Sequence, residues 1–217
     1  PNIIILFLAD GITARKSIGH VNSTRYEISK DMEEKMKKEV GIRKKHAKNA
    51  LKILGISNMK FLDLPDNELD TVPFLKIVKA VEKEIQSSKC KIIFTHHHND
   101  LNIDHRIAYE ASITANRPIF NSSVKTLISF EAISSTDWRK PYKFNPNLFV
   151  DISKELTTKM KSMKEYKNEI QQFPHPRSIK ALEANAIRWG SLSGYKAAEA
   201  FEIITSRMDD LKNLSLG

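Results

Sequence analysis

The sequence predicts an α/β fold in which helices cover the faces of a mostly parallel central sheet. A continuous apolar run at residues 3–8 closes at Asp10-Gly11, which is typical of a strand buried on both faces. Strand-like segments then alternate at short spacing with segments whose apolar residues recur at helical spacing. Ligands in such folds bind beyond the carboxyl ends of the strands, so the loops at Asp10, Asp66 and 96–105 should share one rim.

The individual elements follow from periodicity and from their ends. Residues 29–54 should form a helix, because Ala47, Ala50 and Leu54 lie on one apolar stripe and Gly55 is placed as the terminal cap. The further expected elements are a strand at 59–64, a helix with Pro73 in its first turn, a strand at 91–95, a helix from about His105 that Asp104 could cap, strands at 124–130 and 148–152, and a helix at 153–166 capped by Ser153.

Length and composition favour one domain spanning residues 1–217. With 217 residues, of which 41% are hydrophobic, the chain can bury a sizeable core without a disulfide. Its single cysteine, Cys90, borders an apolar run and should be a buried thiol, which fits a reducing compartment and a cytoplasmic location. No run is apolar and long enough to cross a membrane, and the first residues lack the features of a signal peptide.

The net charge of +9 does not point to a nucleic-acid-binding protein. The lysines are spread over expected helix surfaces, such as 35–48 and 154–167, and are not interleaved with aromatic residues. We therefore expect no nucleic-acid partner, and an association between copies of the chain stays open. The excess charge is compatible with anionic glycolipids or nucleotide sugars.

The densest cluster of chemically active residues is the segment 95–105. Four of the seven histidines and two aspartates fall there, directly after an expected buried strand. Imidazole nitrogen and carboxylate oxygen suit zinc and similar divalent ions. His96 or His97 taken singly could equally line a polar loop, whereas a functional role is favoured for His105, which lies close to Asp100 and Asp104.

Arg43 interrupts the apolar stripe of its helix, four residues before Ala47. A charge there must reach water or find a partner. It could therefore be a substrate clamp or a partner for Asp66, or it could simply extend into solvent; the spacing does not decide. The segment 173–178, in which two prolines flank His175, is interpreted as an ordinary loop.

In their order and spacing, several motifs resemble those of the PIG-L/LmbE deacetylases. They are Phe7-Leu8-Ala9-Asp10-Gly11, Arg43 before Ala47, Leu54-Gly55-Ile56, the segment 61–66, Thr95-His96 with Asp100-Leu101-Asn102-Ile103-Asp104-His105, and the segments 129–131, 149–152, 173–178 and 198–201. The resemblance implies a Rossmann-like three-layer sandwich. It also implies a hydrolase that uses Zn²⁺ or another divalent metal to remove the N-acetyl group from an N-acetylglucosamine conjugate such as a glycolipid, nucleotide sugar or glycoside.

The same resemblance implies roles for particular residues. His105 would be the third metal ligand, Asp104 would orient neighbouring groups, and Arg43 and Asp66 would hold the sugar. Asn102 stands where many members carry a histidine that assists the tetrahedral intermediate; it could donate a hydrogen bond but not shuttle a proton, for which His98 is a candidate.

One family motif is missing from these residues. The Ala-His-Pro-Asp-Asp-Glu segment, which follows the family's first strand and supplies two ligands and the general base, does not occur. We therefore expect the chain to begin at the equivalent of the second strand and to be inactive alone. The competing hypothesis is a noncatalytic sugar-binding or scaffold protein without the metal.

Overall fold

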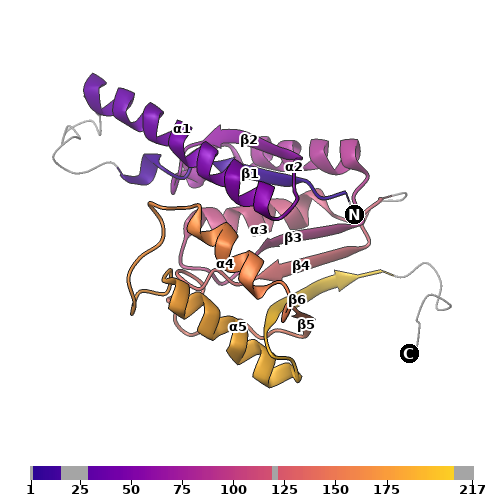
Figure 1. The fold of residues 1–217 in the computed structure, drawn as a ribbon. Helices are drawn as coiled ribbons and strands as arrows, with labels where there is room; N and C mark the ends of the chain where they lie inside the picture. The colour runs from indigo at the N-terminus through magenta and orange to yellow at the C-terminus, as the bar shows by residue number, and fades with distance from the viewer. Residues whose placement is uncertain (1, 16–28, 119–121, 208–217) are drawn as a thin grey trace.

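The structure is a computed structural model that describes residues 2–15, 29–118 and 122–207, and it is built in three layers (Figure 1). In chain order the elements are β1 (Ile5–Ala9), η1 (Thr13–Arg15), α1 (Lys30–Ile53), β2 (Met59–Leu64), η3 (Leu69–Thr71), α2 (Phe74–Ser88), β3 (Ile92–His96), α3 (Ile103–Ala115), β4 (Thr126–Phe130), β5 (Leu148–Asp151), α4 (Leu156–Lys164), α5 (Ile179–Ser193) and β6 (Ala198–Ser206). The predicted α/β class is confirmed.

The described strands form two sheets instead of the single sheet expected. β1 pairs with β2 in parallel, and the second sheet has the order β3-β4-β6-β5. β3 and β4 are parallel, whereas β6 runs antiparallel to both β4 and β5. Figure 1 shows β1, β2, β3 and β4 pointing the same way, so their carboxyl ends lie on one side of the molecule.

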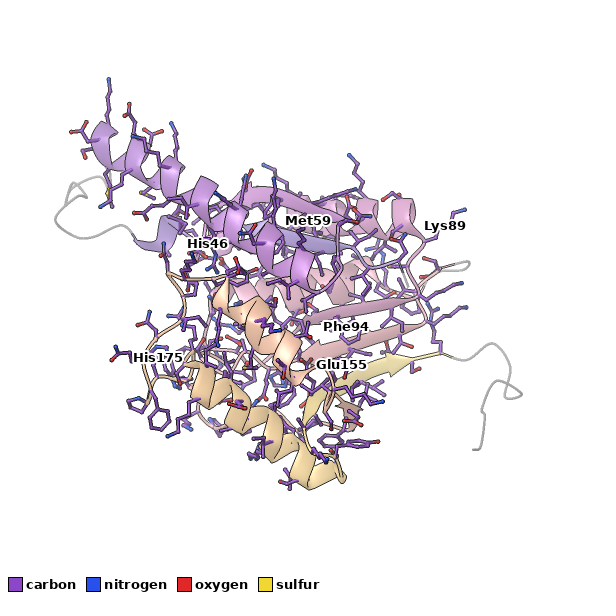
Figure 2. The ribbon with its side chains drawn as sticks, in the orientation of Figure 1. His46, Met59, Lys89, Phe94, Glu155 and His175 are labelled. Carbon is purple, nitrogen blue, oxygen red and sulfur yellow. The ribbon has the colours of Figure 1, made fainter. Side chains whose placement is uncertain are left out.

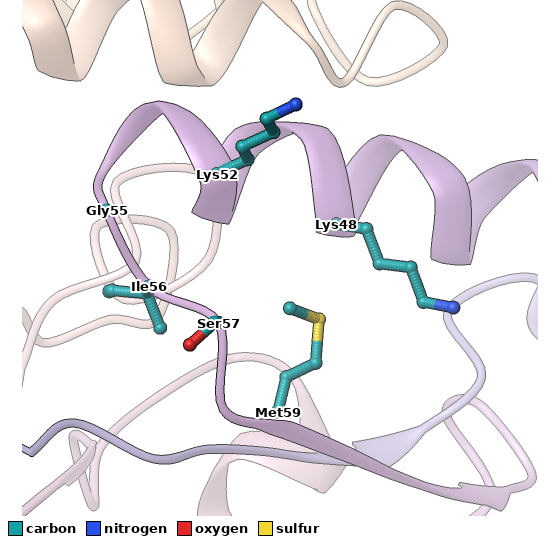
Figure 3. A pocket seen from close by; sticks show the side chains of 6 residues that line it. All are labelled: Lys48, Lys52, Gly55, Ile56, Ser57 and Met59. Carbon is teal, nitrogen blue, oxygen red and sulfur yellow. The ribbon is translucent and has the colours of Figure 1, made fainter.

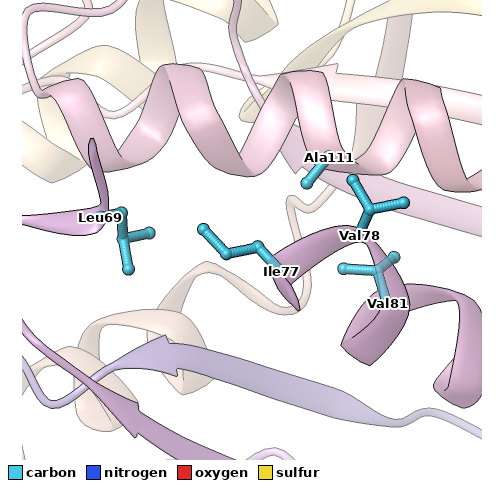
Figure 4. Packing of buried hydrophobic residues seen from close by; sticks show 5 residues of the cluster. All are labelled: Leu69, Ile77, Val78, Val81 and Ala111. Carbon is cyan, nitrogen blue, oxygen red and sulfur yellow. The ribbon is translucent and has the colours of Figure 1, made fainter. Parts of the chain in front are cut away.

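Helices cover the two faces of these sheets. In Figure 1, α1, α4 and α5 lie in front of the strands, and α2 and α3 lie behind them. The back layer is held by a core of apolar side chains from η3, α2 and α3, against which Leu6 and Leu8 of β1 also pack. The buried members are Leu69, Ile77, Val78, Val81 and Ala111 (Figure 4). Because α3 also packs on β3, the two sheets share one helical layer.

The helix ends agree only in part with the sequence predictions. Ser29 caps α1 as expected, accepting a hydrogen bond from the Met32 N–H. The cap of α3 is Asn102 and not Asp104, because the Asn102 side chain accepts the Asp104 N–H. Ser153 does not cap α4: its hydroxyl bonds to Asp151, and the helix starts at Leu156.

The front face of β3 is left uncovered by the described residues. Ile92 and Phe94 are 51% and 54% exposed, whereas Thr95, which points to the other face, is buried (Figure 2). Cys90 lies before this strand and is only partly buried. Among the described residues, no helix is both long and apolar enough to cross a membrane.

Candidate functional site

Hydrogen bonds tie the loops after β1, β2 and β3 together at the carboxyl ends of the strands. The Asp66 N–H donates to Thr13 Oγ1 at 2.7 Å, which joins the loop after β2 to the loop after β1. The Asp104 carboxylate accepts the N–H groups of Asn67 and Leu69, at 2.7 and 3.0 Å. The predicted shared rim is therefore confirmed.

His105 is oriented at this rim by Asp100. Its Nδ1 lies 3.1 Å from Asp100 Oδ1, and the Asp100 side chain is completely buried. Because an ionised carboxylate can only accept, Nδ1 carries the proton of the neutral ring and Nε2 keeps its lone pair. His105 can thus offer Nε2 to a metal ion, in the carboxylate–histidine arrangement typical of metal sites.

The turn after β4 completes the environment of Asp100. Thr136 Oγ1 donates to Asp100 Oδ2 at 2.6 Å and accepts the Ala132 N–H, while Ser135 Oγ lies 3.2 Å from His105 Nδ1. Burial alone would raise the pKa of Asp100, but hydrogen bonds from His105 and Thr136 outweigh it and lower the pKa to about 2. Asp100 is therefore ionised at neutral pH.

Two arginines hold the backbone of the same loop. The Arg106 guanidinium donates to the carbonyl oxygens of Asp100 and Leu101, and Arg139 donates to the Asp100 carbonyl and to the Asn99 side chain. The loop after β3 is thus clamped from α3 and from the turn after β4. A ligand at His105 would find a preorganised position.

His96 packs between His105 and the end of β4. Its ring stacks on His105 with centroids 4.0 Å apart and lies 4.9 Å from the Phe130 ring. Burial, reinforced by neighbouring His105, lowers the pKa of His96 to about 3. The ring is therefore neutral at physiological pH and adds no positive charge beside a metal position.

A second cluster of possible ligands, formed by His97, His98 and Glu202, lies on the same loop and on β6. The ligand atoms of the three residues lie within 4.8 Å of one another. His97 is fully buried, its Nδ1 accepts the Asn99 N–H, and its Nε2 lies 3.2 Å from Glu202 Oε2 in poor hydrogen-bond alignment. The neutral ring must therefore carry its proton on Nε2, and a metal there would have to displace it. This favours a structural histidine–carboxylate pair.

The other predicted site residues take the following places. Asp104 accepts two backbone bonds from the 67–69 loop, so it orients that loop and does not contact His105 Nδ1, which Asp100 occupies. Burial raises the pKa of Asp104 above its ordinary value, although the N–H groups of Leu69 and Asn67 oppose the shift. The His98 ring packs against His97 and Tyr109, and burial, followed by the electrostatic effect of the neighbouring His97 ring, lowers the pKa of His98.

Arg43 is held by the carboxylate of Glu169, which the sequence did not predict as its partner. Its Nη1 lies 3.0 Å from Glu169 Oε1, and its guanidinium lies over the Tyr166 ring at 4.8 Å. Glu169 also pairs with Arg177, which lies in the 173–178 segment. A Cβ at Gly11 would lie 3.3 Å from Arg43 Nε, which brings Arg43 to the rim beside the loop of Asp10. Glu169, Thr136 and Glu202 carried no local motif that could have revealed them.

A separate hollow of about 560 Å³ lies at the other end of the sheet. It is formed by Lys48, Lys52, Gly55, Ile56, Ser57 and Met59 (Figure 3). Met59 is the first residue of β2, so this hollow faces away from the rim that carries His105. It contributes no residue to the candidate site.

Comparison with known families identifies the group of proteins to which the chain is related. The PIG-L family model, described as GlcNAc-PI de-N-acetylase, matches residues 2–116, which is more than half of the chain. The chain belongs to the PIG-L family. A comparison with curated proteins found no match.

Solved structures of PIG-L-like fold are similar over nearly the whole chain. N,N′-diacetylchitobiose deacetylase from Pyrococcus horikoshii, solved with its inhibitor MPG, is 17% identical with a TM-score of 0.66, and the match covers 93% of this chain and 72% of the deacetylase. The A40926 pseudoaglycone deacetylase Dbv21 is 14% identical with a TM-score of 0.65, covering 96% and 87%. GalB, the 4-carboxy-2-hydroxymuconate hydratase of Pseudomonas putida KT2440, is 13% identical with a TM-score of 0.65, covering 95% and 98%. These identities establish the fold, and GalB shows that the fold also carries other chemistry.

Proposed function

We propose that this protein is a metal-dependent hydrolase that removes the N-acetyl group from an N-acetylglucosamine-type sugar conjugate. The observation that carries the proposal is the Asp100–His105 pair, in which a buried carboxylate fixes a histidine with a free Nε2 at the shared rim. Membership of the PIG-L family supports the same reaction. A divalent ion bound there, Zn²⁺ or a related metal, would polarise the acetyl carbonyl and lower the pKa of water.

The surrounding residues could bind the sugar and stabilise the negative charge that develops on the carbonyl oxygen during hydrolysis. Arg43, on α1, and Asp66, in the loop after β2, both lie at the rim, where they would bind sugar hydroxyls. The Asn102 oxygen is engaged in capping α3, which leaves its amide NH₂ to donate to an oxyanion. His98, kept neutral by its lowered pKa, is the candidate for accepting or returning a proton.

We further propose that residues 1–217 form one domain that takes up another parallel strand between β1 and β3. Among the described strands, β1 pairs only with β2, and β3 and its neighbours form a separate sheet. β1 and β3 run in the same direction and rest on one helical layer (Figure 1). On β3, the exposed side chains of Ile92 and Phe94 form an apolar surface that an added segment would cover. Catalytic zinc sites use three protein ligands, so such a segment would supply two further metal ligands in addition to His105.

Acetate release tests the proposed reaction. Protein produced from the complete reading frame would be incubated with a panel of N-acetylglucosamine conjugates, with added zinc and with chelator. We expect metal-dependent release that His105→Ala abolishes and that His46→Ala, on α1, preserves. Sugar binding that a chelator does not affect, without acetate release, would instead support the noncatalytic sugar-binding protein.

The proposed strand has its own test. Backbone amides of β1 and β3 that have no hydrogen-bond partner among the described residues would exchange rapidly with solvent. In protein from the complete reading frame the same amides should become protected. Unchanged exchange along both strands would contradict the added strand.

A cytoplasmic location stays a proposal that follows from the single free Cys90.

A further inference from the structure

Glu169 connects two arginines that come from distant parts of the chain. It lies between α4 and α5, and only 8% of the residue is exposed. Its Oε1 lies 3.0 Å from Nη1 of Arg43, on α1, and its Oε2 accepts a hydrogen bond from Arg177 Nη1 at 2.5 Å. A buried carboxylate is costly unless cations compensate its charge. Each oxygen of Glu169 therefore has a guanidinium group beside it.

The turn that carries Glu169 also supplies an aromatic ring to Arg43. The Glu169 N–H donates to the Tyr166 carbonyl oxygen at 2.8 Å, which closes the turn. The Arg43 guanidinium lies over the Tyr166 ring, 4.8 Å from its centroid. The face of an aromatic ring attracts a cation electrostatically. One turn thus presents both a charge and a flat surface to Arg43, and together they restrict the position and the orientation of its guanidinium.

The remaining nitrogens of Arg43 face the rim. A Cβ at Gly11 would lie 3.3 Å from Arg43 Nε and 3.9 Å from its Nη2, so these two atoms lie against the loop that follows β1. Nη1 is buried, and its contact with Glu169 lacks the alignment of a hydrogen bond, so the attraction is mainly electrostatic. One side of the rigid guanidinium fork is therefore paired with a carboxylate, while the other side is directed toward the loop at the rim.

A purely structural role for Glu169 would be to connect α1 with the residues around α4. Other contacts already make this connection. The Asn49 amide of α1 donates to the Glu165 carboxylate at 3.2 Å, and the Ser162 hydroxyl of α4 donates to the Ala50 carbonyl oxygen at 3.1 Å. Because neither contact needs a buried charge, the choice of a buried carboxylate at position 169 calls for a different reason.

We propose that Glu169 is a positioning residue, which holds Arg43 in the orientation in which it binds the sugar. The inference rests on the proposed function, in which Arg43 binds sugar hydroxyls. Glu169 and Tyr166 fix one side of the guanidinium, and Nε and Nη2 remain for the ligand. Without the carboxylate, the Arg43 side chain would turn toward water and would have to be ordered again on binding, which weakens affinity. The loss therefore appears in substrate binding and not in the chemical step.

The order of the Arg43 guanidinium can be measured without any ligand. Nitrogen-15 relaxation of the Arg43 Nε–H group, in protein from the complete reading frame, gives its order parameter. We expect a value near that of rigid backbone, about 0.85, in the wild type and below about 0.6 in Glu169→Gln. Arg43→Lys removes the signal and so assigns it. A mobile guanidinium in the wild type would overturn the proposal, and this outcome needs no folded variant of Glu169.

The kinetics of acetate release measure the consequence for the substrate. Glu169→Gln keeps the shape of the side chain but removes its charge, and it should raise KM about tenfold while kcat stays within about twofold. Glu165→Gln is the matched control, because it removes a carboxylate from the same segment whose partner on α1 is Asn49. Its KM should equal that of the wild type. Thermal melting would verify that both variants are folded.

A double-mutant cycle shows whether Glu169 acts through Arg43. Once Arg43→Ala has removed the guanidinium, adding Glu169→Gln should change KM no further. An equal effect of Glu169→Gln with and without Arg43 would overturn the proposal. So would a fall in kcat at unchanged KM, or an unchanged KM in the folded Glu169→Gln variant, because each is what a merely structural residue would give.

The outcomes separate this inference from the proposed reaction. Acetate release whose KM does not respond to Glu169→Gln would refute the positioning role and leave the deacetylase function standing. If the complete protein releases no acetate, the proposed function fails, and the dissociation constant of N-acetylglucosamine, measured by calorimetry, takes the place of KM. Binding that Glu169→Gln weakens about tenfold only when Arg43 is present would then still support the positioning role. Absence of sugar binding to the wild type would overturn it.

Discussion

Asp100 Oδ1 lies 3.1 Å from His105 Nδ1 in a position where the Asp100 side chain has no contact with solvent. The two residues are five positions apart, one before and one inside the first turn of α3. Three donors satisfy the buried carboxylate: His105 itself, the Thr136 hydroxyl and the Asn102 N–H. The histidine is therefore positioned by groups that would persist with or without a ligand.

Replacing Thr136 should weaken both the fold and the metal position. Thr136→Val removes a 2.6 Å hydrogen bond to a buried carboxylate, which should lower the free energy of unfolding by about 1–3 kcal/mol. Urea denaturation would measure the loss, and Thr71→Val, at an exposed residue, is the matched control. In protein from the complete reading frame, zinc affinity should fall about tenfold or more. Equal stability of the two variants would contradict the role of Thr136.

The zinc content of histidine variants should distinguish the two candidate metal positions. If His105 is a ligand, His105→Ala should lose bound zinc, whereas His98→Ala should retain it, although His98 belongs to the cluster with His97 and Glu202. His98 is exposed, so its removal should cost little stability. Elemental analysis after dialysis would give the metal content of each folded variant of the complete protein. Zinc lost from His98→Ala and kept by His105→Ala would place the metal at the other cluster.

Asp137 should make stability depend on pH. Burial, followed by the charge of Glu131, raises its pKa to about 6, with smaller opposing effects of Arg188 and Lys140. Because the folded protein binds this proton more tightly than the unfolded chain, the ionised carboxylate destabilises the fold above pH 6, and protonation relieves this between about pH 6 and 4.

The isosteric variant isolates this effect. Asp137→Asn should stabilise the protein at pH 8 by on the order of 1 kcal/mol. This is less than the free energy that corresponds to the whole pKa shift, because the side chain is partly exposed and solvent screens its charge. The difference from the wild type should vanish near pH 4. Denaturant midpoints across this range would measure it, and a difference independent of pH would contradict the assignment.

Two glycines in helices should respond oppositely to substitution by alanine. A Cβ at Gly190 of α5 would lie 2.7 Å from the Ala197 Cα and from the Tyr195 carbonyl oxygen, so the helix would have to move away from β6. We expect Gly190→Ala to cost about 2 kcal/mol or more. Gly41, in α1, has nothing within 4 Å of its Cβ position, and Gly41→Ala should stabilise by about 0.5–1 kcal/mol. Thermal unfolding of both variants would test the contrast.

The sequence predicted most elements of the first half of the chain, where signals are local. The apolar run at 3–8, Ser29 as a helix cap and the aspartate- and histidine-rich segment after β3 each depend on neighbouring residues. It did not predict α5 or β6, because their apolar residues are interrupted by polar ones that have tertiary partners. Asn185 and Trp189, for example, both bind Glu131 from a distant strand end.

The candidate site divides in the same way. The sequence alone determined the α/β class, the expectation that three loops share a rim, and the choice of His105, because these follow from periodicity and from residue types close together in the chain. Only the tertiary structure decided that Asp100 orients His105, that Asp104 holds the 67–69 loop, and that Glu169 pairs with Arg43. Those contacts form only because the shared helical layer brings the ends of particular strands close together. Hydrogen bonds act over only a few ångströms, so the spacing of residues along the chain cannot specify which groups will meet.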